Sequence, residues 1–152
     1  MYLADTNVIS HSAPKAKPPE AGMAEWLHRN GRHVWISVVT LAELSYGAAD
    51  LGRRGPHRRA EALHRWIRDV MALHADRILP VDPATGLRAG ELLARAVGKG
   101  CDPGMEDALI AATAELRGLT VLTRNLADFE PMGVRAIDPF RRLPPDAAAG
   151  AC

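Results

Sequence analysis

Short apolar runs alternate along this chain with longer segments in which apolar residues recur at every third or fourth position. The short runs suit buried strands, and the longer segments suit helices with one apolar face. Alternation of this kind is typical of βα units, whose strands lie parallel within one sheet. We therefore expect an α/β fold built on a parallel sheet.

The predicted strands and helices follow one another from the second residue to about residue 137. Strands are expected at Tyr2–Ala4, His33–Ser37, Ile78–Val81, Thr120–Thr123 and Val134–Ile137. Helices are expected over residues 20–30, 40–51, 83 to 98 or 100, and 105–117, and after residue 56 in a segment whose apolar face comprises Leu63, Trp66, Ile67, Val70 and Met71. Ser37 or Thr40, and Asp82, are expected to cap helices that follow them.

The length of 152 residues matches one ordinary domain, and the hydrophobic content of 47% is typical of a globular protein. We expect a single domain over residues 1–143. Two low-complexity stretches, residues 12–19 and 144–152, are expected to be mobile, the second as a flexible C-terminal tail.

Several features predict a soluble, cytoplasmic protein. No run approaches the roughly 20 apolar residues of a membrane span, so no membrane association is expected. The first residues lack the basic and then apolar pattern of a signal peptide. The cysteines, Cys101 and Cys152, are too few for a disulfide framework, which fits a reducing compartment.

Acidic and amide side chains lie close to predicted strand ends. Asp5 directly follows the first strand, and Asn125 and Asp128 follow the Thr120–Thr123 strand. The carboxyl ends of parallel strands form one edge of the sheet, where ligands bind. Glu43 lies early in the helix after the second strand and can face the same edge. Asp107 lies in the first turn of a later helix, and only the tertiary structure decides whether it reaches the others.

Carboxylates gathered at one edge repel one another unless a cation neutralises them. Ligation by oxygen alone suits Mg²⁺, with Mn²⁺ as an alternative. The six histidines show no paired metal-ligand spacing, which disfavours zinc. A divalent ion held by carboxylates can activate water and stabilise the charge of a phosphodiester, so hydrolysis of a nucleic-acid backbone is the reaction expected.

Each acidic residue also has an ordinary structural interpretation. Asp5 and Asp107 can cap or complement helix N-termini, and Glu43 can lie on a solvent-facing helix surface. Asp128 can be a turn residue beside Phe129.

Basic residues that can contact RNA lie in one arginine-rich segment and beside the sheet edge. Between residues 53 and 68 there are six arginines and one acidic residue, and Arg53, Arg54 and Arg58 are candidate contacts with the phosphate backbone. The alternative is the solvated face of a long helix. Arg124, next to the sheet edge, is the more direct phosphate contact, whereas Trp26, Trp35 and Trp66 are expected in the core.

Four segments, residues 3–10, 37–47, 106–114 and 122–129, read LADTNVIS, SVVTLAELSYG, EDALIAATA and LTRNLADF. In this order and spacing they resemble PIN-domain ribonucleases, and within them the VapC and FitB toxins. The resemblance covers residues 2–140 and implies a three-layer α/β/α PIN-like domain with a central parallel sheet of four to five strands. It also implies that the metal is held by Asp5, Glu43 and Asp107, with hydroxyl support from Thr6 and Thr123.

The sequence departs from the family at one position, because many relatives carry an additional Asp where this chain has Asn125. Asn125 adds no charge, so a second metal ion is in question, and Asp128 can substitute only if its loop turns inward. The family resemblance further implies a homodimer, an RNA substrate and a VapB-like antitoxin whose carboxyl-terminal segment blocks the acidic groove. The function expected is that of an Mg²⁺-dependent endoribonuclease toxin of a VapBC-type pair.

Two other functions remain open from the residues alone. A catalytically weak RNA- or partner-binding PIN-like module is compatible with Asn125. A receiver-like phospho-acceptor domain also gathers acidic residues around Mg²⁺, but it needs a Lys at the end of a late strand, where this chain has Thr123 and Arg124.

Overall fold

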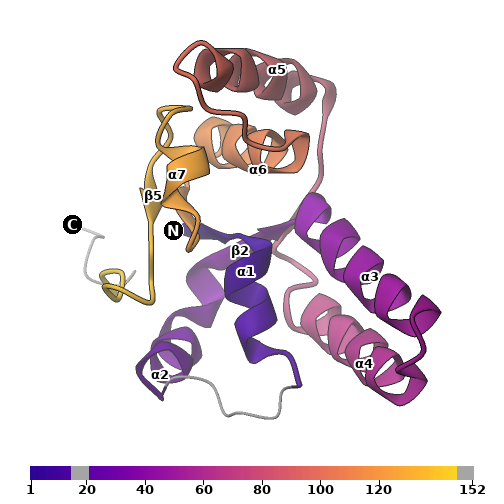
Figure 1. Ribbon diagram of the computed structural model, residues 1–152. Helices are drawn as coiled ribbons and strands as arrows, with labels where there is room; N and C mark the ends of the chain where they lie inside the picture. Colours follow the sequence, from indigo (N-terminus) through magenta and orange to yellow (C-terminus); the bar gives the residue numbers. More distant parts are fainter. Residues whose placement is uncertain (15–20, 147–152) are drawn as a thin grey trace.

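The computed structural model describes residues 1–14 and 21–146, and its centre is a five-stranded parallel sheet (Figure 1). The strands lie in the order β3-β2-β1-β4-β5, and every neighbouring pair is parallel. This confirms the predicted α/β class and the number of strands. Their bounds are β1 (Tyr2–Ala4), β2 (Val34–Ser37), β3 (Ile78–Leu79), β4 (Thr120–Leu122) and β5 (Ala136–Ile137).

The helices that were predicted are all present, with shifted ends. They are α2 (Ala21–Asn30), α3 (Val38–Arg53), α4 (His57–Leu73), α5 (Pro83–Val97) and α6 (Met105–Leu116). Four short elements were not predicted: α1 (Thr6–Ile9), α7 (Leu126–Phe129), and the 3₁₀ helices η1 (Ser10–Ser12) and η2 (Gly31–His33). Elements of three or four residues are too short for an apolar period to reveal them.

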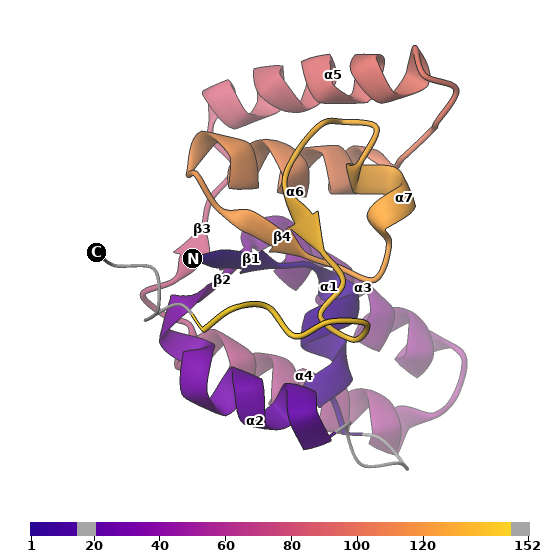
Figure 2. The same ribbon diagram turned by 90° about the vertical axis from the view of Figure 1, so that its left-hand side faces the viewer.

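Helices cover both faces of the sheet, in three layers (Figure 2). On one face α6 packs against the sheet and α5 lies over α6, and their small residues such as Ala89 and Ala111 share one apolar cluster with Leu3 and Val121. On the other face α2, α3 and α4 enclose a second apolar cluster that includes Ile36, Leu122, Trp26 and Ile67. Because successive strand residues point to opposite faces, each strand contributes to both clusters.

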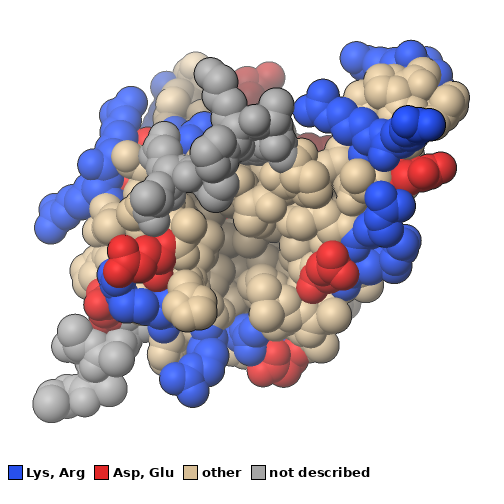
Figure 3. Space-filling model, turned by 90° about the horizontal axis from the view of Figure 1, so that it is seen from below, with Lys and Arg blue, Asp and Glu red and all other residues tan. Residues whose placement is uncertain are grey.

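The expected apolar face of α4 is correct except at its end. Ile67 and Val70 are buried, but Met71 is 44% exposed. The face formed by α2 and α4 is hollowed and largely uncharged at its centre, with Lys and Arg towards its margins (Figure 3). An apolar pocket of about 250 Å³ lies there, between Leu27, Val70 and Leu73. Of the helices that the structure describes, none has the length and apolar character needed to cross a membrane.

The strand order reverses direction between β1 and β4, where the chain returns to the centre of the sheet. Ala4 pairs with Ile36 on one side and with Leu122 on the other. The next residues along the three strands, Asp5, Ser37 and Thr123, therefore stand side by side. In open α/β sheets ligands bind at such a reversal, beyond the carboxyl ends of the strands.

Ser37 starts α3 and so helps to position Glu43 on that helix. Its hydroxyl accepts a hydrogen bond from the amide of Val39 at 3.1 Å, so the N-cap is Ser37, and Thr40 lies inside the helix. Replacing Ser37 by Ala is expected to lower the free energy of unfolding by about 1 kcal/mol, because a buried helix amide loses its partner. Urea denaturation measures the loss, and Ser37→Thr should largely restore stability; equal stability of all three chains would contradict this role.

The first residues of the expected C-terminal tail make contacts with the domain. The hydroxyl of Tyr2 donates to the carbonyl of Pro145 at 2.7 Å, and the side-chain amide of Asn30 donates to Asp146 at 2.7 Å. Residues 147–152 of that tail, and residues 15–19 of the loop expected to be mobile, lie outside the described residues.

Candidate active site

Asp5 lies at the reversal of strand order between β1 and β4, called the crevice here because ligands bind beyond the strand ends at such a point, and it is only 4% exposed. Its carboxylate accepts hydrogen bonds from the amide of Thr6 at 2.6 Å, from the hydroxyl of Thr123 at 2.7 Å and from the side-chain amide of Asn7 at 2.5 Å. Burial raises the pKa of Asp5 although these three hydrogen bonds oppose the rise. Asp5 thus caps the short helix α1, in line with its ordinary structural interpretation, and also places a carboxylate at the sheet edge.

Glu43 faces the same crevice from the second turn of α3. The hydroxyl of Thr6 donates to its carboxylate at 2.5 Å, which ties α3 to α1. Burial raises the pKa of Glu43, and the charges of Asp5 and Glu106 raise it further. The two threonines expected near the metal, Thr6 and Thr123, therefore each donate to one acidic residue of the predicted set.

Asp107 reaches this acidic group from the first turn of α6. Burial, followed by the negative charges of Asp5, Asp128, Glu43 and Glu106, raises its pKa to about 7. Among the described residues no donor forms a hydrogen bond with the Asp107 carboxylate to offset that repulsion. The structure therefore brings the three predicted acidic residues into one electrostatic cluster, although they are far apart in sequence.

Asn125 and Asp128 lie at the margin of this cluster. The side-chain amide of Asn125, which is exposed, donates a hydrogen bond to the carboxylate of Asp128. Asp128 lies on α7, and its charge raises the pKa values of both Asp5 and Asp107. The loop therefore turns far enough inward for Asp128, rather than Asn125, to add charge to the cluster.

Sequence reasoning did not single out Asn7 as a site residue. Its side-chain amide donates to Asp5 and to the hydroxyl of Thr123 at 3.1 Å, and its carbonyl oxygen accepts from the amide of Arg124 at 3.0 Å. Asn7 thereby joins the residues that follow β1 to those that follow β4. Only its place two residues after Asp5 could have suggested this role.

Arg124 is exposed beside the crevice, as expected, and its guanidinium group is oriented by an aromatic ring. The guanidinium carbon lies 3.7 Å from the centroid of the Phe140 ring. Phe140 also contacts the His11 ring in an edge-on arrangement, with the ring centroids 4.8 Å apart. The stack holds a cation at the border of the acidic cluster.

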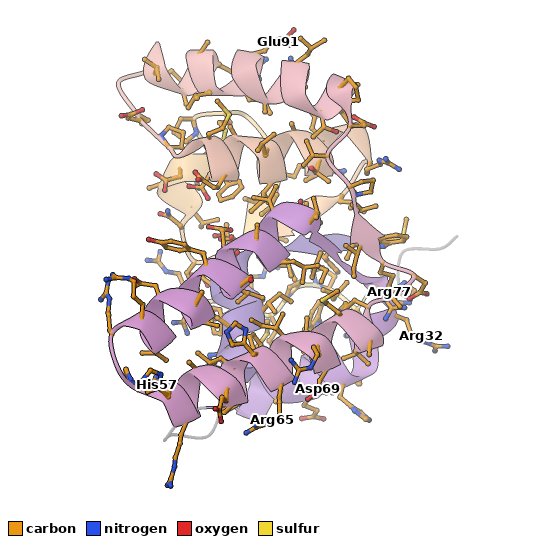
Figure 4. All side chains as sticks on the ribbon, turned by 90° about the vertical axis from the view of Figure 1, so that its right-hand side faces the viewer. Arg32, His57, Arg65, Asp69, Arg77 and Glu91 are labelled. Atoms are coloured by element: carbon orange, nitrogen blue, oxygen red, sulfur yellow. The ribbon has the colours of Figure 1, made fainter. Side chains whose placement is uncertain are left out.

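The arginine-rich segment lies elsewhere. Arg53 follows Glu43 by ten positions on α3, about 15 Å farther along the helix axis. Arg53 and Arg54 both form ion pairs with Asp50, at 2.8 and 2.7 Å, which lowers the local positive charge. Arg58 is exposed near the start of α4, and Arg65 projects from the side of α4 that faces away from α6 (Figure 4). The structure does not bring these arginines to the acidic cluster.

Oxygen atoms of carboxylates, hydroxyls and an amide line the cluster, which is the donor set that Mg²⁺ prefers. In their present positions, no three His, Cys, Asp or Glu side chains of residues 1–14 and 21–146 are grouped closely enough to form a ready metal site. The residue types therefore fit a hard cation, and binding one requires side chains to rearrange.

Three comparisons place the chain among known proteins. The family model of the PIN domain matches residues 2–131. The VapC ribonuclease Y4jK of Sinorhizobium fredii is 35% identical over 92% of this chain and 98% of its own length. Toxin FitB of Neisseria gonorrhoeae is 33% identical over 92% of this chain and 99% of its own length.

Solved structures agree with the sequence comparisons. The crystal structure of FitAcB from Neisseria gonorrhoeae superposes with a TM-score of 0.76 at 32% identity, covering 92% of this chain and 99% of the other. DNA-bound VapBC from Salmonella typhimurium superposes with a TM-score of 0.66 at 30% identity, covering 90% and 96%. The expected resemblance is confirmed, and the chain belongs to the PIN-domain family, within its VapC and FitB group.

Proposed function

We propose that this protein is an Mg²⁺-dependent endoribonuclease that acts as the toxin of a VapBC-type toxin–antitoxin pair. The observation that carries the proposal is that Asp5, Glu43 and Asp107 gather, partly or fully buried, beyond the carboxyl ends of β1 and β4, where burial and neighbouring carboxylates raise their pKa values. Negative charge gathered from three distant segments costs stability, and a divalent cation lowers that cost. Relatives named ribonuclease and tRNA(fMet)-specific endonuclease support RNA as the substrate.

Asp5, Glu43 and Asp107 are the residues proposed to hold Mg²⁺, or Mn²⁺ in its place. The chemistry that the bound ion supplies is activation of water and neutralisation of charge on the phosphodiester. Asp128 is proposed to accept a proton or to hold a water molecule at the edge of the cluster. Thr6 and Thr123 orient Glu43 and Asp5 through their hydroxyl groups. Asn7 keeps the two sides of the crevice together.

Arg124 is proposed to bind the phosphate backbone next to the acidic cluster, where RNA would otherwise be repelled. Removing the guanidinium in Arg124→Ala is expected to raise KM for RNA about tenfold, because a charge-assisted contact is lost. Phe140→Leu should raise KM by a smaller factor, since the guanidinium remains but is no longer held by the ring. Initial rates over a range of RNA concentrations measure both effects. Arg65→Ala, an exposed arginine on α4, is the matched control, and an equal KM in all four proteins would refute the assignment.

An antitoxin partner and a homodimer complete the proposal. The solved relatives named FitAcB and VapBC support a VapB-like partner. A homodimer is proposed from family membership, and sedimentation of the purified chain tests it. A short reading frame for a small DNA-binding protein next to the gene would support the partner.

The test of the activity is incubation of the purified chain with structured RNAs in Mg²⁺ and in EDTA. Cleavage that requires Mg²⁺ is expected. RNA binding without cleavage, in either condition, would instead identify a catalytically silent module, which the side-chain bond between Asn125 and Asp128 makes a reasonable second function.

A further inference from the structure

A surface pocket of about 210 Å³ adjoins the acidic cluster between α3 and α6. Its walls are the apolar side chains of Val39 and Ala42, the ring of Tyr46, and the carboxylates of Glu43 and Glu106. Glu43 belongs both to this pocket and to the proposed metal site. A group seated in the pocket therefore lies next to the position where a phosphodiester would be cleaved.

Tyr46 is an aromatic residue without a structural role in the described part of the chain. Its side chain is 73% exposed, and no described residue forms a hydrogen bond or a ring contact with it. It follows Glu43 by three positions on α3, so the two side chains share one side of the helix. Gly47, beside it, leaves open space, since no atom lies within 4 Å of where a Cβ would stand. An exposed ring over open space suits stacking with a flat ligand.

Glu106 supplies a hydrogen-bond acceptor to the same pocket. It is exposed at the start of α6 and is not one of the three acidic residues proposed to hold the ion. One of its carboxylate oxygens would lie only 3.0 Å from a Cβ placed on Gly104, so the glycine leaves room for this side chain. No described residue donates a hydrogen bond to either carboxylate oxygen of Glu106. The two oxygens can therefore accept two N–H groups from one edge of a ligand.

We propose that this pocket binds a guanine base next to the cleaved phosphodiester, an inference that rests on the proposed ribonuclease function. The base stacks on Tyr46, and its N1–H and N2–H groups donate together to Glu106. Adenine and cytosine offer one exocyclic amine beside an acceptor, and uracil offers one N–H between two carbonyls, so each repels part of the carboxylate. The base itself is neutral, so it can enter beside two carboxylates while Arg124 meets the phosphate.

RNA is favoured over a protein segment because of what lies around the pocket. The pocket is continuous with Glu43, and its two anchors, an aromatic face and a carboxylate, match the stacking and edge contacts by which unpaired bases are recognised. Its small apolar walls are too limited to hold a helix.

Binding of fluorescent octaribonucleotides tests the proposal without relying on cleavage. The octamers are oligoadenylates that carry one central guanosine, inosine or adenosine, and the protein is the Asp107→Asn variant in Mg²⁺, so that the RNA stays intact. Guanosine is expected to bind about fivefold more tightly than inosine, which lacks the N2 amine. Adding Tyr46→Ala should weaken guanosine binding about tenfold, and Tyr46→Phe should retain it. Glu106→Gln should remove the preference for guanosine over inosine.

Leu87→Ala, which removes an exposed side chain on α5, is the control and should bind like the parent (Leu87 is 76% exposed). Equal binding by Tyr46→Ala and Leu87→Ala, or no preference for guanosine, overturns the proposal. Loss of antitoxin binding in Tyr46→Ala with unchanged RNA binding assigns the pocket to a protein segment and also overturns it. If binding depends on guanosine and on Tyr46 but the wild-type chain never cleaves RNA, the guanine site is supported and the proposed nuclease function is refuted.

Discussion

Replacing Asp107 by Asn is expected to lower the single-turnover rate of RNA cleavage by about 100-fold or more while leaving the fold intact. The substitution keeps the size of the side chain and removes one of three charges proposed to hold the ion. Loss of the charge stabilisation that a divalent ion gives to a phosphoryl transition state costs several kcal/mol, and each 1.36 kcal/mol is about tenfold in rate. Asp5→Asn is expected to have an effect of the same size.

The matched control is Asp69→Asn, an identical substitution of an exposed residue on α4 (Figure 4). It should cleave RNA at the wild-type rate. Circular dichroism of all three variants shows whether loss of activity reflects loss of structure. Cleavage by Asp107→Asn within threefold of the wild-type rate would exclude Asp107 from the site.

Asp107→Asn is also expected to stabilise the metal-free protein at alkaline pH. Burial and surrounding acidic residues raise the pKa of Asp107 to about 7, whereas an unfolded Asp titrates near 4. Between these values the folded protein binds more protons than the unfolded chain, so its stability falls as the pH rises from about 4 to about 7. The loss is complete above pH 7 and absent below pH 4. The raised pKa values of Asp5 and Glu43 act in the same direction.

In EDTA at pH 8, Asp107→Asn should therefore exceed the wild type in free energy of unfolding by about 1–3 kcal/mol, a range reduced for the partial exposure of the carboxylate. At pH 4 the two proteins should be equally stable. Urea denaturation at both pH values measures the difference, with Asp69→Asn again as the control. If Asp107→Asn is less stable than the wild type at pH 8, the Asp107 carboxylate makes favourable contacts and is not destabilised by burial and neighbouring charge.

The strands and the acidic residues that follow them could be predicted from sequence because both depend on local patterns. A buried parallel strand reads as a short apolar run, and the residue after it lies at the sheet edge whatever the rest of the chain does. Asp5, Asn125 and Asp128 were found in this way, whereas Thr123 was named only from the family resemblance. Asp107 could not be placed by the same argument, because the position of α6 over the crevice follows from its packing against α5 and the sheet.

The contacts that complete the site were beyond sequence reasoning because they join distant segments. Asn7 contacts Thr123 and Arg124 only because β1 and β4 are neighbours, and the Phe140 ring meets Arg124 only after the chain has passed β5. Counting charges along the sequence also overstated the basic character of residues 53–68. Asp50 lies just outside that window and pairs with two of its arginines.

Binding of Mn²⁺, followed by the electron paramagnetic resonance signal of the free ion, tests most directly whether Asp5, Glu43 and Asp107 form one cation site. The wild type should remove free Mn²⁺ from solution with saturation, and Mg²⁺ should compete. Asp5→Asn, Glu43→Gln and Asp107→Asn should each weaken binding at least about tenfold, whereas Asp69→Asn should bind like the wild type. Wild-type affinity in all three acidic-site variants, or no binding by the wild type, would contradict a shared divalent cation at the crevice between β1 and β4.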